Sequence, residues 1–180
     1  MIRTRASYLM LAISGLCLCI AVSSALSDMG MKEDNDVQFL QDAATSNSWM
    51  ITLGELALRQ AASRDVIVFS RQMVEDQGRI GQDLKRLSDR KGIKLAADND
   101  IVRLNTTEYL SKEYGAAFDR LYMSLLSDEH QRDAVLYKKE AEKGQDDDIK
   151  AYAVRTMKKF EEYAVTAKKI LADIPKPLLK

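Results

Sequence analysis

His130 is the only histidine in the chain, and it follows two acidic residues, Asp128 and Glu129. An imidazole beside carboxylates can act as a metal ligand or as a general base. Adjacent helical positions point about 100° apart, however, so the two acids cannot easily share one substrate atom. Metal sites in proteins normally use three or four ligands. The role of His130 therefore depends on which other side chains the fold brings to it.

The surrounding sequence predicts four long amphipathic helices, because apolar residues recur at three- and four-residue steps. Tight turns near Ser63 and Gly144 favour an antiparallel four-helix bundle. The first two long helices are predicted at 36–61 and at 63–92, the second with Ser63 as N-cap and Gly92 as C-terminal glycine. A crossover with a short helix at 101–110 follows. The last two long helices are predicted at 116–143 and from the acids of "QDDD" to just before Pro175.

The same periodicity predicts the buried faces. On the first helix the predicted face is Leu40, Ala44, Asn47, Ile51, Gly54, Leu58 and Ala61. On the third helix it is Met123, Leu126, His130, Ala134, Tyr137 and Ala141. The ring of His130 should therefore point into the bundle.

Gln77 lies as many residues after Ser63 as His130 lies before Gly144. Each helical residue rises about 1.5 Å, so residues equally far from these turns lie at one height. We therefore predict a mid-bundle polar layer of Gln77, His130, Tyr163 and Met50. One imidazole with an amide, a phenol and a thioether does not suit a hard or borderline divalent metal. We expect His130 to hydrogen-bond with Gln77, Tyr163 or water.

Composition limits the possible partners. The chain has 27 basic and 27 acidic residues, and no basic face dominates. Nucleic-acid binding depends on clustered Lys and Arg, so this balance argues against it. With 8 glycines and 2 prolines in 180 residues, the chain is typical of a folded, helix-rich domain.

The first residues predict export. Arg3 and Arg5 precede an apolar, uncharged run from Leu9 to Val22, and Ser23-Ser24-Ala25 supplies small residues for cleavage. The run is shorter than the ~18–20 apolar residues of a spanning helix. We therefore predict a signal peptide at 1–25, a polar tether at 26–35, the bundle at 36–174 and a tail at 175–180. An uncleaved inner-membrane anchor is the alternative, and only then would the chain be bound to a membrane.

Three stretches carry a resemblance to a known family: "FLQDAATSNSWMITLGELALRQAASRDVIVFSRQMVEDQ", "FDRLYMSLLSDEHQRDAVLYKKEAEKG" and "IKAYAVRTMKKFEEYAVTAKKIL". In this order, after a signal peptide, they resemble the exported bacterial proteins of domain of unknown function 4142. The resemblance implies a ferritin-like bundle. Histidines are usual in that family on the second and fourth helices, where this chain has Gln77 and Tyr163, so only His130 is retained.

These observations predict a non-catalytic, periplasmic or secreted bundle that acts as a binding or envelope-stress module. No catalytic residue, cofactor or metal site is predicted, and the partner is an unknown protein or small molecule. The alternative is a ferritin-like metal-binding or redox protein whose site around His130 is degenerate.

Overall fold

The structure, a computed structural model, describes the backbone of residues 11–96 and 100–176, with side chains from residue 35 onward. Residues 1–10 of the predicted signal peptide and 177–180 of the predicted tail lie outside these ranges. The described chain is all-α, as predicted, and contains five helices: α1 (Leu11–Gln60), α2 (Arg64–Arg90), α3 (Ile101–Leu110), α4 (Gly115–Lys143) and α5 (Asp147–Asp173).

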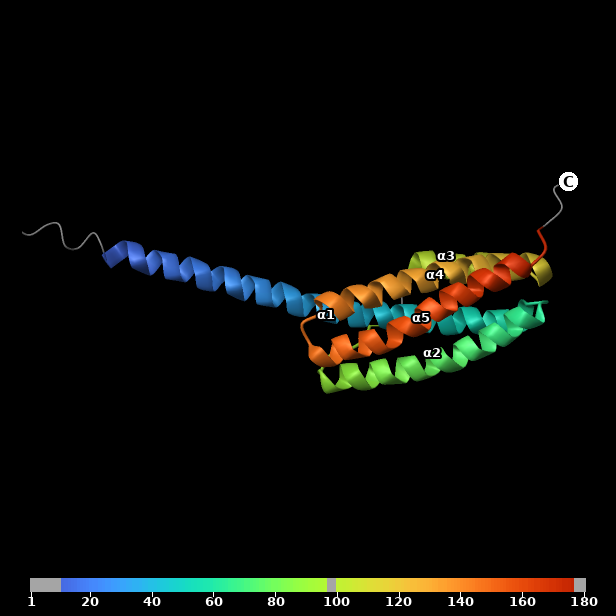
Figure 1. Cartoon of the computed structure of the whole chain (residues 1–180), viewed down its shortest axis with the longest axis horizontal. Helices are drawn as coiled ribbons and strands as arrows, with labels where there is room; N and C mark the ends of the chain where they lie inside the picture. The colour runs from blue at the N-terminus through green and yellow to red at the C-terminus, as the bar shows by residue number, and fades with distance from the viewer. Residues whose placement is uncertain (1–10, 97–99, 177–180) are drawn as a thin grey trace, which may run out of the picture.

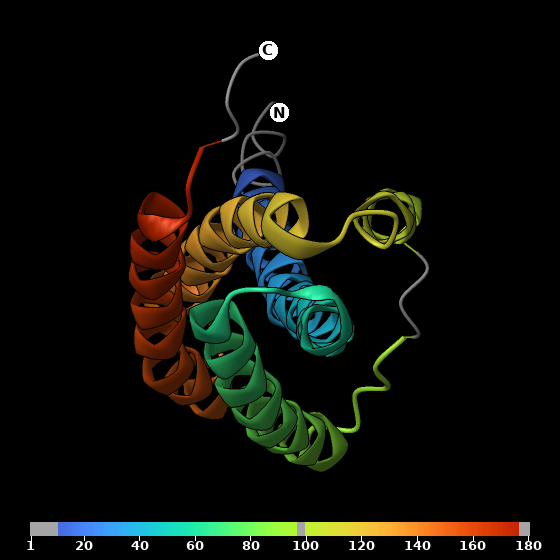
Figure 2. The same ribbon diagram turned by 90° about the vertical axis from the view of Figure 1, so that its right-hand side faces the viewer.

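Four of these helices form the predicted antiparallel bundle (Figure 1). Helix α1 packs on α2 and α4, and α5 packs on the same two helices, so every neighbouring pair runs in opposite directions. The long connection between α2 and α4 carries α3, which lies outside the bundle against α4 (Figure 2). The bounds of α3 are those predicted from the sequence.

Helix α1 is longer than predicted. It begins at Leu11 and continues to Gln60, so the segment 26–35, which we predicted as a polar tether, is helical. Its N-terminal part extends away from the bundle (Figure 1). The helical state of this segment was not predicted, because the segment lacks apolar periodicity, and a proline-free segment can still extend a helix nucleated beside it. No helix in the described ranges combines the length and apolar character needed to span a membrane.

The ends of the helices follow the predicted turn residues, with one exception. Gly92 adopts a left-handed φ of 69° after α2, and Asp146 accepts hydrogen bonds from the N–H groups of Asp148 and Ile149 at the start of α5. Ser63, the predicted N-cap of α2, makes no such bond with its side chain. Ser63 nevertheless holds the N-cap position with an extended backbone, and Asp119 of α4 accepts from its N–H at 2.7 Å. A long-range carboxylate thus supports the turn before α2.

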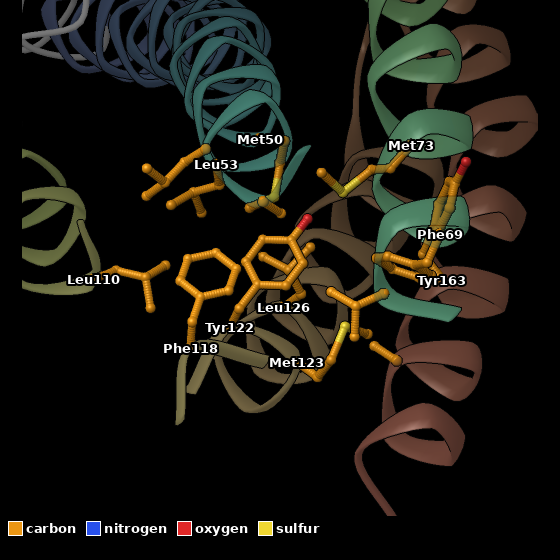
Figure 3. Close-up of a cluster of buried hydrophobic side chains, with 14 of the residues drawn as sticks. Met50, Leu53, Phe69, Met73, Leu110, Phe118, Tyr122, Met123, Leu126 and Tyr163 are labelled. Atoms are coloured by element: carbon orange, nitrogen blue, oxygen red, sulfur yellow. The ribbon is translucent and has the colours of Figure 1, made fainter. Parts of the chain in front are cut away.

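Two clusters of buried apolar side chains form the core. One lies toward the α1–α2 turn (Figure 3), and the other lies toward the α4–α5 turn. On α1 the buried face is displaced from the predicted one, because α1 contacts two helices: Met50 and Leu53 are fully buried, whereas Leu58 is 39% exposed. Gly54 allows α1 to approach α2 closely, since a Cβ there would overlap Val74 Cγ2 and lie 2.9 Å from Met73 Cε.

Candidate functional site

His130 is fully buried on α4, where aromatic side chains enclose it. Its ring stacks on Tyr163 and Phe160, with ring centroids 5.1 and 5.9 Å away, and Phe69 presents an edge at 6.5 Å. The Nε2 atom lies 3.4 Å from the Sδ atom of Met73. The Nδ1 atom has no hydrogen-bond partner in the structure. The only histidine of the chain therefore sits among rings and a thioether.

The structure unites part of the predicted polar layer. His130 and Tyr163 are in contact, and Met50 belongs to the same buried cluster as Tyr163. Gln77 faces α1, where Asn47 Nδ2 donates to its backbone oxygen at 2.7 Å and to its Oε1 at 2.8 Å. Of the predicted hydrogen-bond partners of His130, namely Gln77, Tyr163 or water, the two side chains are not bonded to it. Tyr163 stacks on the imidazole, and Asn47 engages Gln77.

Burial also determines the charge of His130. Removal from water lowers the pKa of His130 to about 3, because desolvation penalises the charged imidazolium. The ring is accordingly neutral near pH 7. A general base needs a pKa near the working pH. In this conformation His130 therefore does not serve as an acid–base group.

Asp76 is the carboxylate closest to this layer. The hydroxyl of Tyr163 donates to Asp76 Oδ2 at 2.6 Å, Arg79 forms an ion pair with it, and Lys159 Nζ lies 3.5 Å away. Burial raises the pKa of Asp76, but the hydrogen bonds from Tyr163 and Arg79 and the charge of Lys159 outweigh it, so the pKa is lowered overall. Asp76 is thus an ionised carboxylate whose oxygens already have partners.

Two further buried carboxylates were missed by the sequence reasoning. Ser46 Oγ donates to both oxygens of Asp133, at 2.8 and 2.9 Å, and burial raises the pKa of Asp133 to about 6. Burial, followed by the neighbouring charge of Asp36, raises the pKa of Glu140 to about 7. Both acids lie on the inward face of α4, and helical spacing from other inward residues could have predicted this. Asp133 lies three residues after His130, and Glu140 lies three residues after Tyr137.

The residues around His130 do not fit the di-metal centre that a ferritin-like bundle implies. Such a centre needs a Glu from each of two helices and a Glu-x-x-His pair from each of the others. Here Ser127 occupies the position three residues before His130. Within the ranges that the structure describes, no three His, Cys, Asp or Glu side chains lie close enough to hold an ion. The donors at this level do not suit hard or borderline divalent metals.

A surface groove of about 640 Å³ runs between α2 and α5, directly outside this layer. Phe69 and Tyr163, whose rings contact His130, line the groove, and Val68 and Ile170 add apolar surface. Acidic and basic side chains complete its lining, namely those of Asp65, Asp76, Lys159, Glu162, Lys169 and Asp173. The groove is therefore amphiphilic, with aromatic and aliphatic surface among charges of both signs.

These features define a class of protein: an all-α, antiparallel four-helix bundle whose described residues hold no carboxylate-bridged metal centre. The model of a family described as a domain of unknown function (DUF4142) matches residues 21–170. The chain belongs to this family, as its resemblance at the sequence level implied.

One solved structure extends the comparison of the fold. The chain is similar to a protein described as a secreted DUF305 protein from Streptomyces coelicolor, with a TM-score of 0.68 and 12% identity. The alignment covers 81% of this chain and 98% of that one. At this identity the likeness establishes the shared bundle and nothing finer. Among curated proteins no relative matches the chain.

Proposed function

We propose that the chain is an exported, non-catalytic binding module that takes a small amphiphilic molecule in the groove between α2 and α5. The observation that carries the proposal is the groove itself, which places two aromatic side chains beneath a charged rim. Ligand sites in helical bundles are commonly concave and mostly apolar, with a few polar groups that orient the ligand. Of the two roles predicted from the sequence, binding or envelope stress, the geometry supports binding.

The state of the polar side chains supports a non-catalytic role. The buried imidazole of His130 is neutral and enclosed, and Asp76 is held by Tyr163 and Arg79. A catalytic pair needs a nucleophile within hydrogen-bond reach of a base with a tuned pKa. The buried hydroxyls of Ser46 and Tyr163 each donate to a carboxylate, that of Asp133 and of Asp76, and neither hydroxyl is hydrogen-bonded to His130.

Two observations support export. Basic residues Arg3 and Arg5, the apolar run that follows and the small residues before Leu26 have the order of a cleaved signal peptide. The structurally similar Streptomyces coelicolor protein is described as secreted. N-terminal sequencing of the exported chain tests this part of the proposal. A start near Leu26 supports cleavage, and an intact Met1 would show that the segment is retained as an anchor.

The chemistry of the groove indicates the kind of ligand. Phe69 and Tyr163 offer aromatic surface for a flat or aliphatic body. Lys159 lies 5.9 Å from the centre of the Tyr163 ring and 3.6 Å from Glu162. These two charges can rearrange to meet a polar group of either sign. We therefore expect a ligand with an apolar body and a polar end.

A fluorescent probe tests the groove directly. N-phenyl-1-naphthylamine gains fluorescence in apolar surroundings, so a titration with the full chain should saturate at one site. Val68 lines the groove and is 54% exposed, so Val68→Glu should add charge without disturbing the core and weaken probe binding at least about tenfold. Val135→Glu is the matched control, because Val135 is similarly exposed on α4.

The control should bind the probe as the wild type does. Unsaturable fluorescence, or equal affinities for the wild type and the Val68→Glu variant, would refute the groove as the binding site. Circular dichroism of both variants verifies that the bundle is intact.

A further inference from the structure

The side chain nearest the only histidine is a thioether. Met73 Sδ lies 3.4 Å from His130 Nε2, and both residues are fully buried. Two more of the chain's 8 methionines, Met50 and Met123, are fully buried in the same cluster as Met73. In Figure 3, Met50 and Met73 extend from α1 and α2 into the space between these helices. One soft donor, the thioether of Met73, therefore contacts the imidazole, and two further methionines belong to the same buried cluster as Met73.

The ring of His130 lacks the hydrogen bonds that would explain a buried histidine. Buried polar groups are almost always paired, yet Nδ1 is without a partner and Nε2 meets only a thioether, which is a weak acceptor. Either tautomer leaves one ring nitrogen unsatisfied. A purely structural role therefore accounts poorly for this residue type at this position.

The separation of the two donors suits one metal ion. Bonds of roughly 2.0 Å to an imidazole nitrogen and 2.3 Å to sulfur span a gap of 3.4 Å at an angle of about 105°. This angle is close to that of a tetrahedral or strongly bent site. Methionine is flexible and adjusts its sulfur position at low cost, so an ion can enter without a change in the helices.

The type of donor selects the type of ion. Both donors are neutral, and the thioether is soft, so the pair favours Cu(I) over Mg(II) and, through its sulfur, over Zn(II). A single positive charge also costs less to bury than a double one. The surroundings therefore suit a soft, monovalent ion.

We propose that His130 Nε2 and Met73 Sδ form a binding site for Cu(I). The inference is independent of the ligand proposed for the groove. Binding moves the imidazole proton to Nδ1 and leaves Nε2 bonded to the metal.

The single histidine makes the site visible by NMR. The full chain, carrying Cys17→Ser and Cys19→Ser so that no thiol competes, is labelled with nitrogen-15 histidine. Silver nitrate supplies Ag(I), a diamagnetic stand-in for Cu(I), in excess over the 8 methionines. The expected result is a new Nε2 signal in slow exchange with the free one, with the proton on Nδ1. Unchanged ring signals after prolonged incubation with Ag(I) would overturn the proposal.

Variants of two methionines locate the second donor. Met73→Leu conserves volume and removes the sulfur, and should lower Cu(I) affinity in a competition assay at least about tenfold. Met157→Leu is the matched control, because Met157 packs against the other cluster, and it should bind Cu(I) as the parent does. Equal affinities for both variants would overturn the assignment of Met73. Thermal melts establish that both are folded, and the NMR experiment on the parent needs neither variant.

Discussion

Glu140 and Asp36 place two carboxyl groups side by side where α1 meets the α4–α5 turn. Asp36 accepts from the N–H groups of Gln145 and Asp146, at 3.0 and 2.7 Å, so its charge is well stabilised. Glu140 has no comparable donor, and its Oε1 is buried without a partner. Burial, and then repulsion from Asp36, raises the pKa of Glu140 from 4.5 to about 7. Folding therefore favours the protonated form of Glu140.

The sign of the pH dependence follows from this shift. Between pH 4.5 and 7 the folded chain keeps a proton on Glu140 that the unfolded chain releases, so the free energy of unfolding falls as pH rises. A rise in pKa from 4.5 to about 7, at about 1.4 kcal/mol per pKa unit, corresponds to at most roughly 3 kcal/mol, and solvent screening at the partly exposed carboxyl group lowers this value. The stabilisation is complete below pH 4.5 and lost above pH 7.

Glu140→Gln isolates this contribution, because glutamine keeps the shape of the protonated acid and cannot ionise. Urea denaturation of the wild type and the variant gives the free energy of unfolding at pH 5 and at pH 8. We expect similar stabilities at pH 5 and a variant more stable by up to about 3 kcal/mol at pH 8. A variant that is less stable than the wild type at pH 8 would refute the reasoning. Burial also raises the pKa of Asp133. Because the wild type and the variant both contain Asp133, its contribution to the pH dependence cancels when their stabilities are compared.

Three further substitutions test other contacts by urea or thermal denaturation. Tyr163→Phe removes the hydroxyl that donates to Asp76 and should lower the free energy of unfolding by about 1.5–3 kcal/mol at pH 7. The loss should be smaller at pH 2–3, because a carboxylate with a lowered pKa loses its stabilising bond as it is protonated. An equal loss at both pH values would contradict this account. Gly54→Ala should destabilise by about 1–3 kcal/mol, since its methyl group meets Val74 and Met73, and an unchanged melting temperature would show that the helices separate freely. Asp119→Ala should cost about 1–2 kcal/mol, because it removes the acceptor of the Ala62 and Ser63 N–H groups, and a neutral effect would show that water replaces the carboxylate.

Much of the architecture followed from local patterns. The bounds of α3 and the turn at Gly92 rest on periodicity and on residues with special backbone freedom, and both were predicted correctly. Family membership likewise followed from the order of three degenerate stretches. The helical state of 26–35 was missed because the segment lacks apolar periodicity. Ser63 is the N-cap of α2, as predicted, but its bond to Asp119 was missed because the two residues are distant in sequence.

The interior was predicted less well than the fold. Counting residues from the turns placed His130 and Tyr163 at one level, and their rings are stacked. The same counting could not show that Asn47 would engage Gln77 or that Met73 would face the imidazole. These contacts depend on the rotation of each helix about its axis, which packing decides. A displacement of one position on α1 is enough to exchange the partners of a polar residue.

The central claim is that the imidazole of His130 is enclosed and neutral, without converging carboxylates. A pH titration of the nitrogen-15 histidine signals measures this directly in the metal-free full chain. The account predicts a neutral ring from pH 8 down to pH 5, because burial lowers the pKa of His130 to about 3. Protonation with a pKa between 6 and 8 would place the ring in water or beside a carboxylate, and would contradict the account.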